Sequence, residues 1–149
     1  MPSPQPPKHR ITKALPKMIA KASSAALQEA FEDHLAETES QIERLDEVFA
    51  LLKIKPDSVT CQAIDGIIKE ADEVASEVAD PAVLDAGLLA AAQAVEHYEM
   101  ARYGTLVAWA KRLGHHDAAA LFETTLAEER AADQKLSLLA NSEVNAKAA

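Results

Sequence analysis

The chain has 149 residues, with 24 acidic and 15 basic side chains and a formal net charge of −9. This length suits one domain with a core of its own, and the acid excess argues against binding to nucleic acids or anionic membrane surfaces. Only four glycines and three phenylalanines, beside abundant Ala, Leu, Glu and Lys, favour an all-α protein. The single Cys61 excludes an internal disulfide and a cysteine-based metal site. No apolar run is as long as a membrane span, and the N-terminus lacks the apolar core of a signal peptide, so we expect a cytoplasmic protein.

Apolar residues recur at helical spacing along most of the chain. Residues 1–10, MPSPQPPKHR, are expected to be extended or disordered, and Pro16 should shorten or kink the helix that follows to residue 22. Ser23, Ser24 and the Asp80-Pro81 pair are helix-start signals, and Gly114 is a stop signal. We predict long helices over 25–53, 81–113 and 118–140, a connecting helix over 58–77, and a flexible tail over 141–149. One domain over 11–140 then forms an antiparallel four-helix bundle with its connector placed as in ferritin-like bundles, and with a shortened first helix.

Polar side chains interrupt the apolar stripe of each long helix. Projection at about 100° per residue places Glu96 and Glu99 on the core-facing stripe of the helix over 81–113. Carboxylates are almost never buried unless they are paired or bind a metal. The other helices contribute His34, Glu37, Thr38 and Gln41, and Glu128, Glu129 and Asp133, with Glu37 at a stripe edge and Glu129 near a stripe centre. Helices of a bundle meet at their middles, so these residues predict an interior site for iron or manganese.

Each residue also has a purely structural interpretation. A glutamate at a stripe edge can reach water, and His34 can be a hydrogen-bonded core histidine. Arg102 and Arg130 can neutralise the carboxylates in an ion-pair network without metal. The chain has no Glu-x-x-His motif, although Glu96-x-x-Glu99 and His34-x-x-Glu37 have helical spacing. We expect His97 to face solvent, His115 and His116 to form an exposed turn, and Cys61 to act as a small buried hydrophobe.

Four segments in this order carry a family resemblance: ALPKMIAKASSAALQEAFEDHLAETESQIERLDEVF (14–49), CQAIDGIIKEADE (61–73), AAAQAVEHYEMARYGTLVAWAKRLG (90–114) and AALFETTLAEERAADQKLSLLA (119–140). The chain resembles the YciE/YciF family of bacterial stress-associated ferritin-like proteins, for which ferroxidase activity has been suggested. The resemblance implies a ferritin-like bundle with a carboxylate-rich dinuclear centre. The ligands that it implies are Glu37, Glu96, Glu99, and Glu128 or Glu129, with His34 and Gln41 as polar neighbours or ligands.

The chain departs from the family at its start. Family members have a longer first helix with a DAEKQ-like segment before the ALPKM block, and the acid of that segment resembles a metal ligand. Here the segment reads PPKHRITKALPKM, and Lys8 falls at the position of that acid. The site then binds metal with fewer ligands, has lost its function, or is completed by another subunit. A shortened first helix also leaves apolar surface on its partners, which a homodimer would cover.

Two functions remain as alternatives. The first is a ferroxidase-type stress protein that uses a dinuclear iron or manganese site to oxidise Fe(II) with O₂ or peroxide. The second is a non-enzymatic helical stress protein with a degenerate metal site, which acts through dimerisation or a protein partner. For a third function, a storage cage, the sequence specifies no cage-forming contacts. No catalytic residue is assigned.

Overall fold

The computed structural model describes residues 7–149, and its regular structure is helical throughout. The all-α prediction is therefore confirmed for this part of the chain. No helix within residues 7–149 is both long enough and apolar enough to cross a membrane. The helices are α1 (Pro7–Lys21), α2 (Ala25–Leu52), α3 (Gln62–Glu77), α4 (Pro81–Arg112), α5 (His116–Leu139), the π-helical turn Ala140–Val144 and α6 (Asn145–Ala148).

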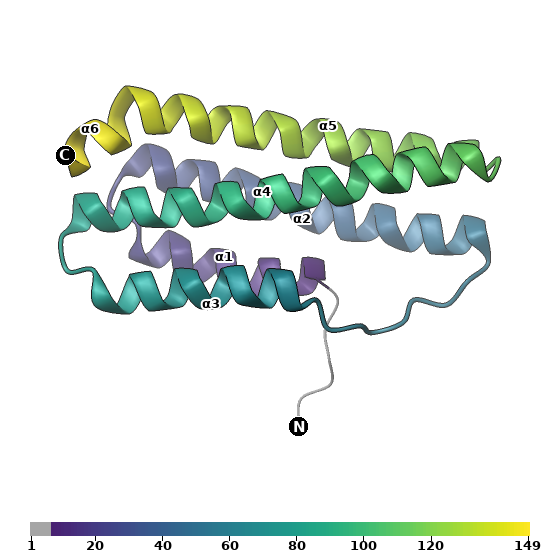
Figure 1. The fold of residues 1–149 in the computed structure, drawn as a ribbon, viewed down its shortest axis with the longest axis horizontal. Coiled ribbons are helices and arrows are strands. Elements are labelled where there is room, and N and C mark those ends of the chain that lie inside the picture. Colours follow the sequence, from purple (N-terminus) through teal and green to yellow (C-terminus); the bar gives the residue numbers. More distant parts are fainter. Residues whose placement is uncertain (1–6) are drawn as a thin grey trace.

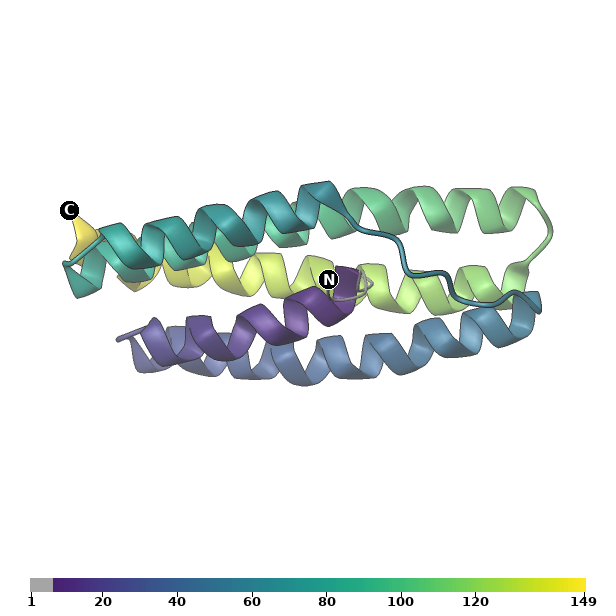
Figure 2. The ribbon, with the colours of Figure 1, turned by 90° about the horizontal axis from the view of Figure 1, so that it is seen from below.

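Helices α2, α4 and α5 run the length of the molecule, whereas α1 and α3 cover only one end of it (Figure 1). Helix α4 packs against α3 and α5, while α1 packs against α2 and α3. After α2, residues 53–61 return along the bundle toward its middle, where α3 begins (Figure 2). This is a ferritin-like bundle with a shortened first helix. As a result, the first turn of α1 lies near the middle of the bundle.

The predicted helix-start and helix-stop signals act as expected. The Ser24 side chain caps α2 by accepting a hydrogen bond from the backbone N–H of Leu27. Asp80 caps α4, and Pro81 takes the first helical position, where its missing N–H has no partner to lose. Gly114 follows α4 with φ of 81°, a left-handed conformation that favours glycine.

A buried carboxylate fixes the turn between α1 and α2. Asp85 of α4, only 4 % exposed, accepts hydrogen bonds from the backbone N–H groups of Ser23 and Ser24, each at 2.8 Å, and from the Ser23 hydroxyl at 2.7 Å. These bonds join the α1–α2 turn to α4. They therefore help to set the position of α1 on the bundle.

Both ends of the chain differ from the prediction. Residues 7–10, expected to be extended or disordered, form the first turn of α1, because Pro7 stands at a helix start that tolerates proline. The rest of that predicted segment, residues 1–6, lies outside the described residues. The predicted flexible tail over 141–149 instead contains a π-helical turn and α6, because Val144, 2 % exposed, packs into the core.

Helix α1 contains Pro16 and ends at Lys21, one residue before the predicted end at residue 22. A smaller difference concerns the start of the connecting helix. Helix α3 begins at Gln62 rather than residue 58, because residues 54–60 are exposed and have no apolar packing to support a helical turn.

Two apolar cores lie along the bundle. The larger one gathers residues of α1, α3 and the adjoining ends of the long helices, such as Leu15, Phe31 and Leu88. The smaller one lies where only the three long helices continue, around Tyr103 and Phe122. Apart from Asp85 at the start of α4, the buried polar residues of the long helices, which include His34, Gln41, Glu96, Glu99 and Glu129, lie around the junction of these two cores. The bundle therefore contains a polar layer with apolar packing on both sides.

Candidate metal centre

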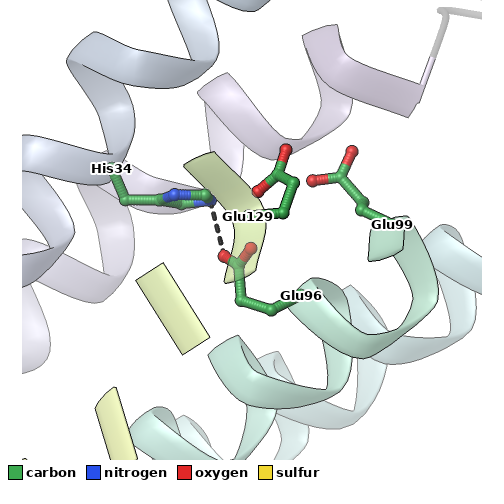
Figure 3. Close-up of side chains that lie close together, drawn as sticks. All are labelled: His34, Glu96, Glu99 and Glu129. Carbon is green, nitrogen blue, oxygen red and sulfur yellow. Dashed lines mark ion pairs between the residues drawn. The ribbon is translucent and has the colours of Figure 1, made fainter. Parts of the chain in front are cut away.

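Four acidic or imidazole side chains meet in the polar layer. His34 comes from α2, Glu96 and Glu99 come from successive turns of α4, and Glu129 comes from α5. One ligand-type atom from each lies within 4.8 Å of the other three, and their side chains converge in Figure 3. Their exposed fractions are 7 %, 1 %, 4 % and 0 %, in the same order. We call these four residues the inner cluster.

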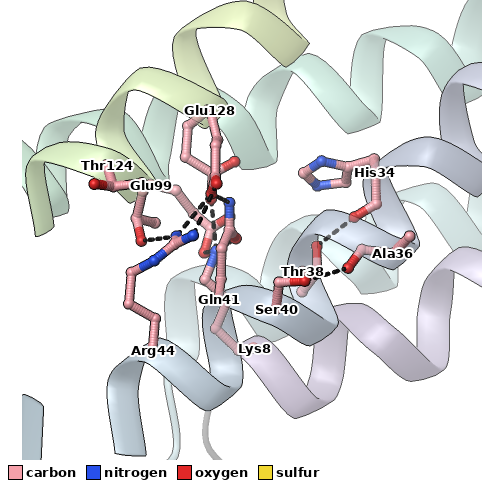
Figure 4. Close-up of polar contacts among 12 residues, drawn as sticks. Lys8, His34, Ala36, Thr38, Ser40, Gln41, Arg44, Glu99, Thr124 and Glu128 are labelled. Atoms are coloured by element: carbon pink, nitrogen blue, oxygen red, sulfur yellow. Dashed lines mark hydrogen bonds and ion pairs between the residues drawn. The ribbon is translucent and has the colours of Figure 1, made fainter. Parts of the chain in front are cut away.

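A lysine from α1 enters the same layer. Lys8, 3 % exposed, places its Nζ 2.8 Å from Glu99 Oε1 and 2.6 Å from Glu129 Oε1. It also donates a 2.5 Å hydrogen bond to Gln41 Oε1 (Figure 4). The ring centre of Tyr103 lies 5.2 Å from the ammonium nitrogen. The ammonium group thus has three oxygen acceptors and an aromatic ring around it.

The inner cluster retains unpartnered atoms. Oε2 of Glu96, Glu99 and Glu129 has no hydrogen-bond partner among residues 7–149. His34 Nε2 lies 2.8 Å from Glu96 Oε1, but its orientation does not satisfy a hydrogen bond, and Nδ1 is also unpartnered within the described chain. Buried polar atoms are nearly always satisfied, so these atoms call for a proton, a water molecule or a metal ion.

Burial and neighbouring charges set the protonation states. Burial raises the pKa of Glu96 far above its usual value, and the nearby Glu129 carboxylate raises it further. Burial also raises the pKa of Glu99, although the Lys8 charge opposes this effect. For Glu129, burial is outweighed by the neighbouring Glu96 carboxyl group, which donates a hydrogen bond to Glu129 once it is protonated, and by the Lys8 charge, so the pKa of Glu129 is lowered. At neutral pH a proton on Glu96 therefore faces an ionised Glu129.

The two nitrogen-bearing side chains behave differently. Burial lowers the pKa of His34 and favours a neutral imidazole, which is the form that binds metals. Burial alone would also favour a neutral Lys8 amine, but attraction by Glu99 and Glu129 raises the pKa of Lys8 above its usual value. The layer thus contains a charged Lys8 ammonium group and a neutral His34 imidazole that can bind a metal.

A second set of polar residues lies on the outer side of this layer. Arg44 of α2 donates two hydrogen bonds to the Glu128 carboxylate, at 2.8 and 2.9 Å, and a third to the Thr125 hydroxyl at 2.8 Å. Gln41 Nε2 donates to Glu128 Oε2 at 3.0 Å, which links this set to Lys8 (Figure 4). We call Arg44, Thr125 and Glu128 the outer cluster. Both of its Glu128 oxygens have partners.

The structure brings together four of the six predicted ligand residues, namely the inner cluster. Glu128 instead pairs with Arg44, and Glu37 is half-buried and outside the four-residue group. Glu37 lines a cavity of about 120 Å³ that also reaches His34 and Glu96. The place of the four inner-cluster residues on the apolar stripes predicts that they point into the bundle. That they bind metal remains a prediction.

The remaining sequence candidates lie elsewhere. His97, which was expected to face solvent, is 64 % exposed in its side chain and pairs with Asp133 at 3.0 Å. His115 and His116 are exposed, as predicted, but His116 is the first residue of α5 and does not belong to the predicted turn. Cys61 is partly buried, with its sulfur 3.1 Å from the Tyr98 hydroxyl.

The arginines named as counter-ions do not take that role. Arg130 is exposed, and Arg102 lies over the Tyr98 ring at 5.0 Å. Lys8 and Arg44 neutralise the carboxylates instead. The signal that could have revealed Lys8 in the core is Pro7, which marks a helix start one residue earlier.

The fold and this layer define a class of protein. A ferritin-like helical bundle surrounds a buried group of three carboxylates and one imidazole, a donor set that suits iron or manganese. The chain belongs to the family described as a domain of unknown function, DUF892, whose model matches residues 8–149.

Its relatives include Protein YciF of Escherichia coli strain K12. The sequences are 48 % identical over 142 residues, which cover 93 % of this chain and 84 % of YciF. The crystal structure of YciF, described as a stress protein, superposes with a TM-score of 0.89 and 45 % identity over 93 % of this chain and 88 % of that one. YcfI of Rhodopseudomonas palustris, described as a proposed structural protein, gives a TM-score of 0.86 and 58 % identity over 88 % of this chain and 83 % of its own.

Proposed function

We propose that this protein is a cytoplasmic, ferritin-like stress protein whose inner cluster binds a divalent transition metal and oxidises Fe(II) with O₂ or peroxide. The observation that carries the proposal is the convergence of four buried ligand-type side chains that retain unpartnered atoms. Hard carboxylate oxygens and one imidazole are the donors that iron and manganese prefer. The description of YciF as a stress protein supports the physiological setting.

His34, Glu96, Glu99 and Glu129 would hold the metal, and a bound iron would supply redox chemistry. The protein's own part is to keep His34 neutral and to give up the proton of Glu96 when a cation arrives. The balanced reaction consumes four Fe(II), one O₂ and four protons, and yields four Fe(III) and two waters. With peroxide, two Fe(II), one H₂O₂ and two protons yield two Fe(III) and two waters.

Two cavities support access to the inner cluster. A largely apolar cavity of about 350 Å³ between α1, α2, α3 and α4 ends on His34 and Glu96. Apolar cavities of this kind admit small apolar molecules, so O₂ fits this route. The smaller cavity also has Asp33 and Lys135 in its wall, and because these two side chains pair with each other, Glu37 is the carboxylate there that favours the approach of a cation.

The test is anaerobic addition of Fe(II) to metal-stripped protein, followed by air, with bound iron and O₂ uptake measured together. We expect iron binding and rapid O₂ uptake in the parent protein and their loss in Glu99→Ala. Glu128→Gln is the matched control, because it removes a neighbouring carboxylate that already pairs with Arg44. Uptake that survives Glu99→Ala would refute the inner cluster as the site.

A second candidate function is a non-enzymatic structural bundle. It is favoured by Lys8, whose ammonium group already neutralises Glu99 and Glu129, and by the description of YcfI as a proposed structural protein. In this case no metal binds above buffer level. Replacing Glu96 alone by Gln would then change the stability of the metal-free protein little near neutral pH, since the Glu96 carboxyl group is already protonated there.

Either function is compatible with a homodimer, which we also propose. Trp109 and Leu113, 63 % and 71 % exposed, lie at the end of α4 that α1 and α3 do not cover, and Leu51 and Ile54 are exposed at the end of α2. A second copy would bury this apolar surface. Light scattering after size-exclusion chromatography should give twice the chain mass for the parent protein and the chain mass for Trp109→Glu. A monomeric parent protein would contradict the dimer.

A further inference from the structure

We propose that Lys8 occupies one of the two cation positions of the polar layer, so that the inner cluster binds a single divalent ion. This inference rests on the proposed metal function and specifies its stoichiometry. Lys8 then acts as a built-in positive charge that determines how many ions the site accepts. The evidence is that some carboxylate oxygens contact the Lys8 ammonium group while others have no partner.

The ammonium group uses one oxygen of each neighbouring carboxylate. Lys8 Nζ contacts Oε1 of Glu99 and Oε1 of Glu129, at 2.8 and 2.6 Å. Oε2 of both residues has no hydrogen-bond partner among the described residues. Glu99 and Glu129 thus each hold the ammonium group with one oxygen and leave the other for a different cation.

The unpartnered oxygens belong to the inner cluster. Besides Oε2 of Glu99 and Glu129, Oε2 of Glu96 and both ring nitrogens of His34 lack partners within residues 7–149. One nitrogen and three oxygens, each from a different side chain, are a suitable donor set for one iron or manganese ion. An ion on the other side of Glu99 and Glu129 would have to displace the Lys8 ammonium from oxygens that it already contacts.

The balance of charges also indicates that the inner cluster binds one divalent ion. The three ionised carboxylates of the inner cluster carry three negative charges, and Lys8 with one divalent ion carries three positive charges. A second divalent ion would leave two positive charges uncompensated in a layer where every member is at most 7 % exposed, and an uncompensated buried charge is strongly unfavourable. Glu128 cannot supply the balance, because Arg44 already pairs with it.

The experiment counts bound Mn²⁺ by equilibrium dialysis and elemental analysis on the full chain. We expect one Mn²⁺ in the parent protein and two in Lys8→Glu, where four carboxylates balance two divalent ions. Lys13→Glu is the matched control, because it makes the same charge change on an exposed position of the same helix. It should still bind one ion. Glu96→Gln combined with Glu99→Gln gives the background from exposed carboxylates.

Each outcome separates the two proposals. No Mn²⁺ above background in the parent protein contradicts the metal function itself. Two ions in the parent protein leave that function standing and overturn the role of Lys8, as does a single ion in folded Lys8→Glu. Circular dichroism checks the folding of the variant. If Lys8→Glu does not fold, the count on the parent protein decides, with one ion supporting the proposal and two overturning it.

Discussion

The inner and outer clusters use neighbouring residues of one helix in opposite ways. Glu128 and Glu129 are adjacent in α5, yet Glu128 is bound by Arg44 and Gln41 through both oxygens, whereas Glu129 contacts Lys8 through one oxygen and leaves the other unpartnered. The Glu128 side chain is 26 % exposed and that of Glu129 is 0 % exposed. The cluster nearer to water is therefore the more completely satisfied one.

This difference separates an ion pair from a cation site. Near the surface, an arginine with a planar fork matches a carboxylate and completes its hydrogen bonds. In the inner cluster a single ammonium group faces three buried carboxylates and cannot satisfy all of their oxygens. Incomplete pairing of fully buried groups is costly unless another cation or a proton is present.

The largest expected contrast is in stability without metal. Lys8→Met leaves Glu99 and Glu129 without their buried cation and should lower the free energy of unfolding by about 3 kcal/mol or more. Arg44→Met breaks the partly exposed pair with Glu128 and should lower it by no more than about 1 kcal/mol. Urea unfolding of metal-stripped proteins measures both values. Equal losses would remove the distinction between the two clusters.

Metal binding should sharpen the contrast by stabilising only a protein with an intact inner cluster. At a free Mn²⁺ concentration about 100 times the dissociation constant, the free energy of unfolding should rise by about 2.7 kcal/mol. Glu128→Gln should retain this gain, while Glu96→Gln should lose most of it. Thermal unfolding with and without Mn²⁺ provides the measurement, and a gain unaffected by Glu96→Gln would place the ion elsewhere.

A smaller effect should appear with pH. Burial raises the pKa of Glu96 to about 11 and that of Glu99 to about 7, both above the ordinary value of 4.5. Their contributions to stability are fully present below pH 4.5, and they are lost as pH rises toward pH 7 for Glu99 and pH 11 for Glu96. The lowered pKa of His34 has the opposite effect and makes stability rise with pH, but only below pH 6.5.

Between pH 7 and 9 Glu96 therefore dominates, and the metal-free protein should lose up to about 1 kcal/mol per pH unit. Bound metal replaces the Glu96 proton, so the metal-loaded protein should show little loss over the same range. Urea unfolding at several pH values, with and without Mn²⁺, makes the comparison. Metal-free stability that rises from pH 7 to 9 would contradict the protonation of Glu96.

The smallest effect concerns the outer cluster alone. A double-mutant cycle of Arg44→Met and Glu128→Gln should give a coupling energy below about 1 kcal/mol, because both side chains are partly exposed. The coupling should weaken in high salt. A coupling of several kcal/mol would mean that the outer cluster is as strongly desolvated as the inner one.

Much of the fold and part of the site could be predicted from sequence, because both depend on helical periodicity. The apolar stripes of α2, α4 and α5 predicted the bundle, and the polar residues on those stripes included His34, Glu96, Glu99 and Glu129. Residues that share one face of a helix are fixed by local geometry. These four residues are buried because the apolar face of each helix points into the bundle.

Contacts between helices could not be predicted in the same way. Lys8 and Glu129 are 121 positions apart, and only the docking of α1 brings them together. The prolines before Lys8 suggested an extended segment, although Pro7 is compatible with a helix start. Glu128 and Glu129 both lie near the apolar stripe of α5, so the stripe alone does not distinguish them. Their partners on other helices do, because Glu128 pairs with Arg44 of α2 and Glu129 with Lys8 of α1.

The most direct test of the account is a crystal structure grown with Mn²⁺ and analysed by anomalous scattering at the manganese edge. The account predicts one anomalous peak per chain among His34, Glu96, Glu99 and Glu129, with the Lys8 ammonium still against Glu99 and Glu129. Two peaks in the polar layer would contradict the role of Lys8. No peak there, or peaks only at exposed carboxylates, would contradict the metal centre itself.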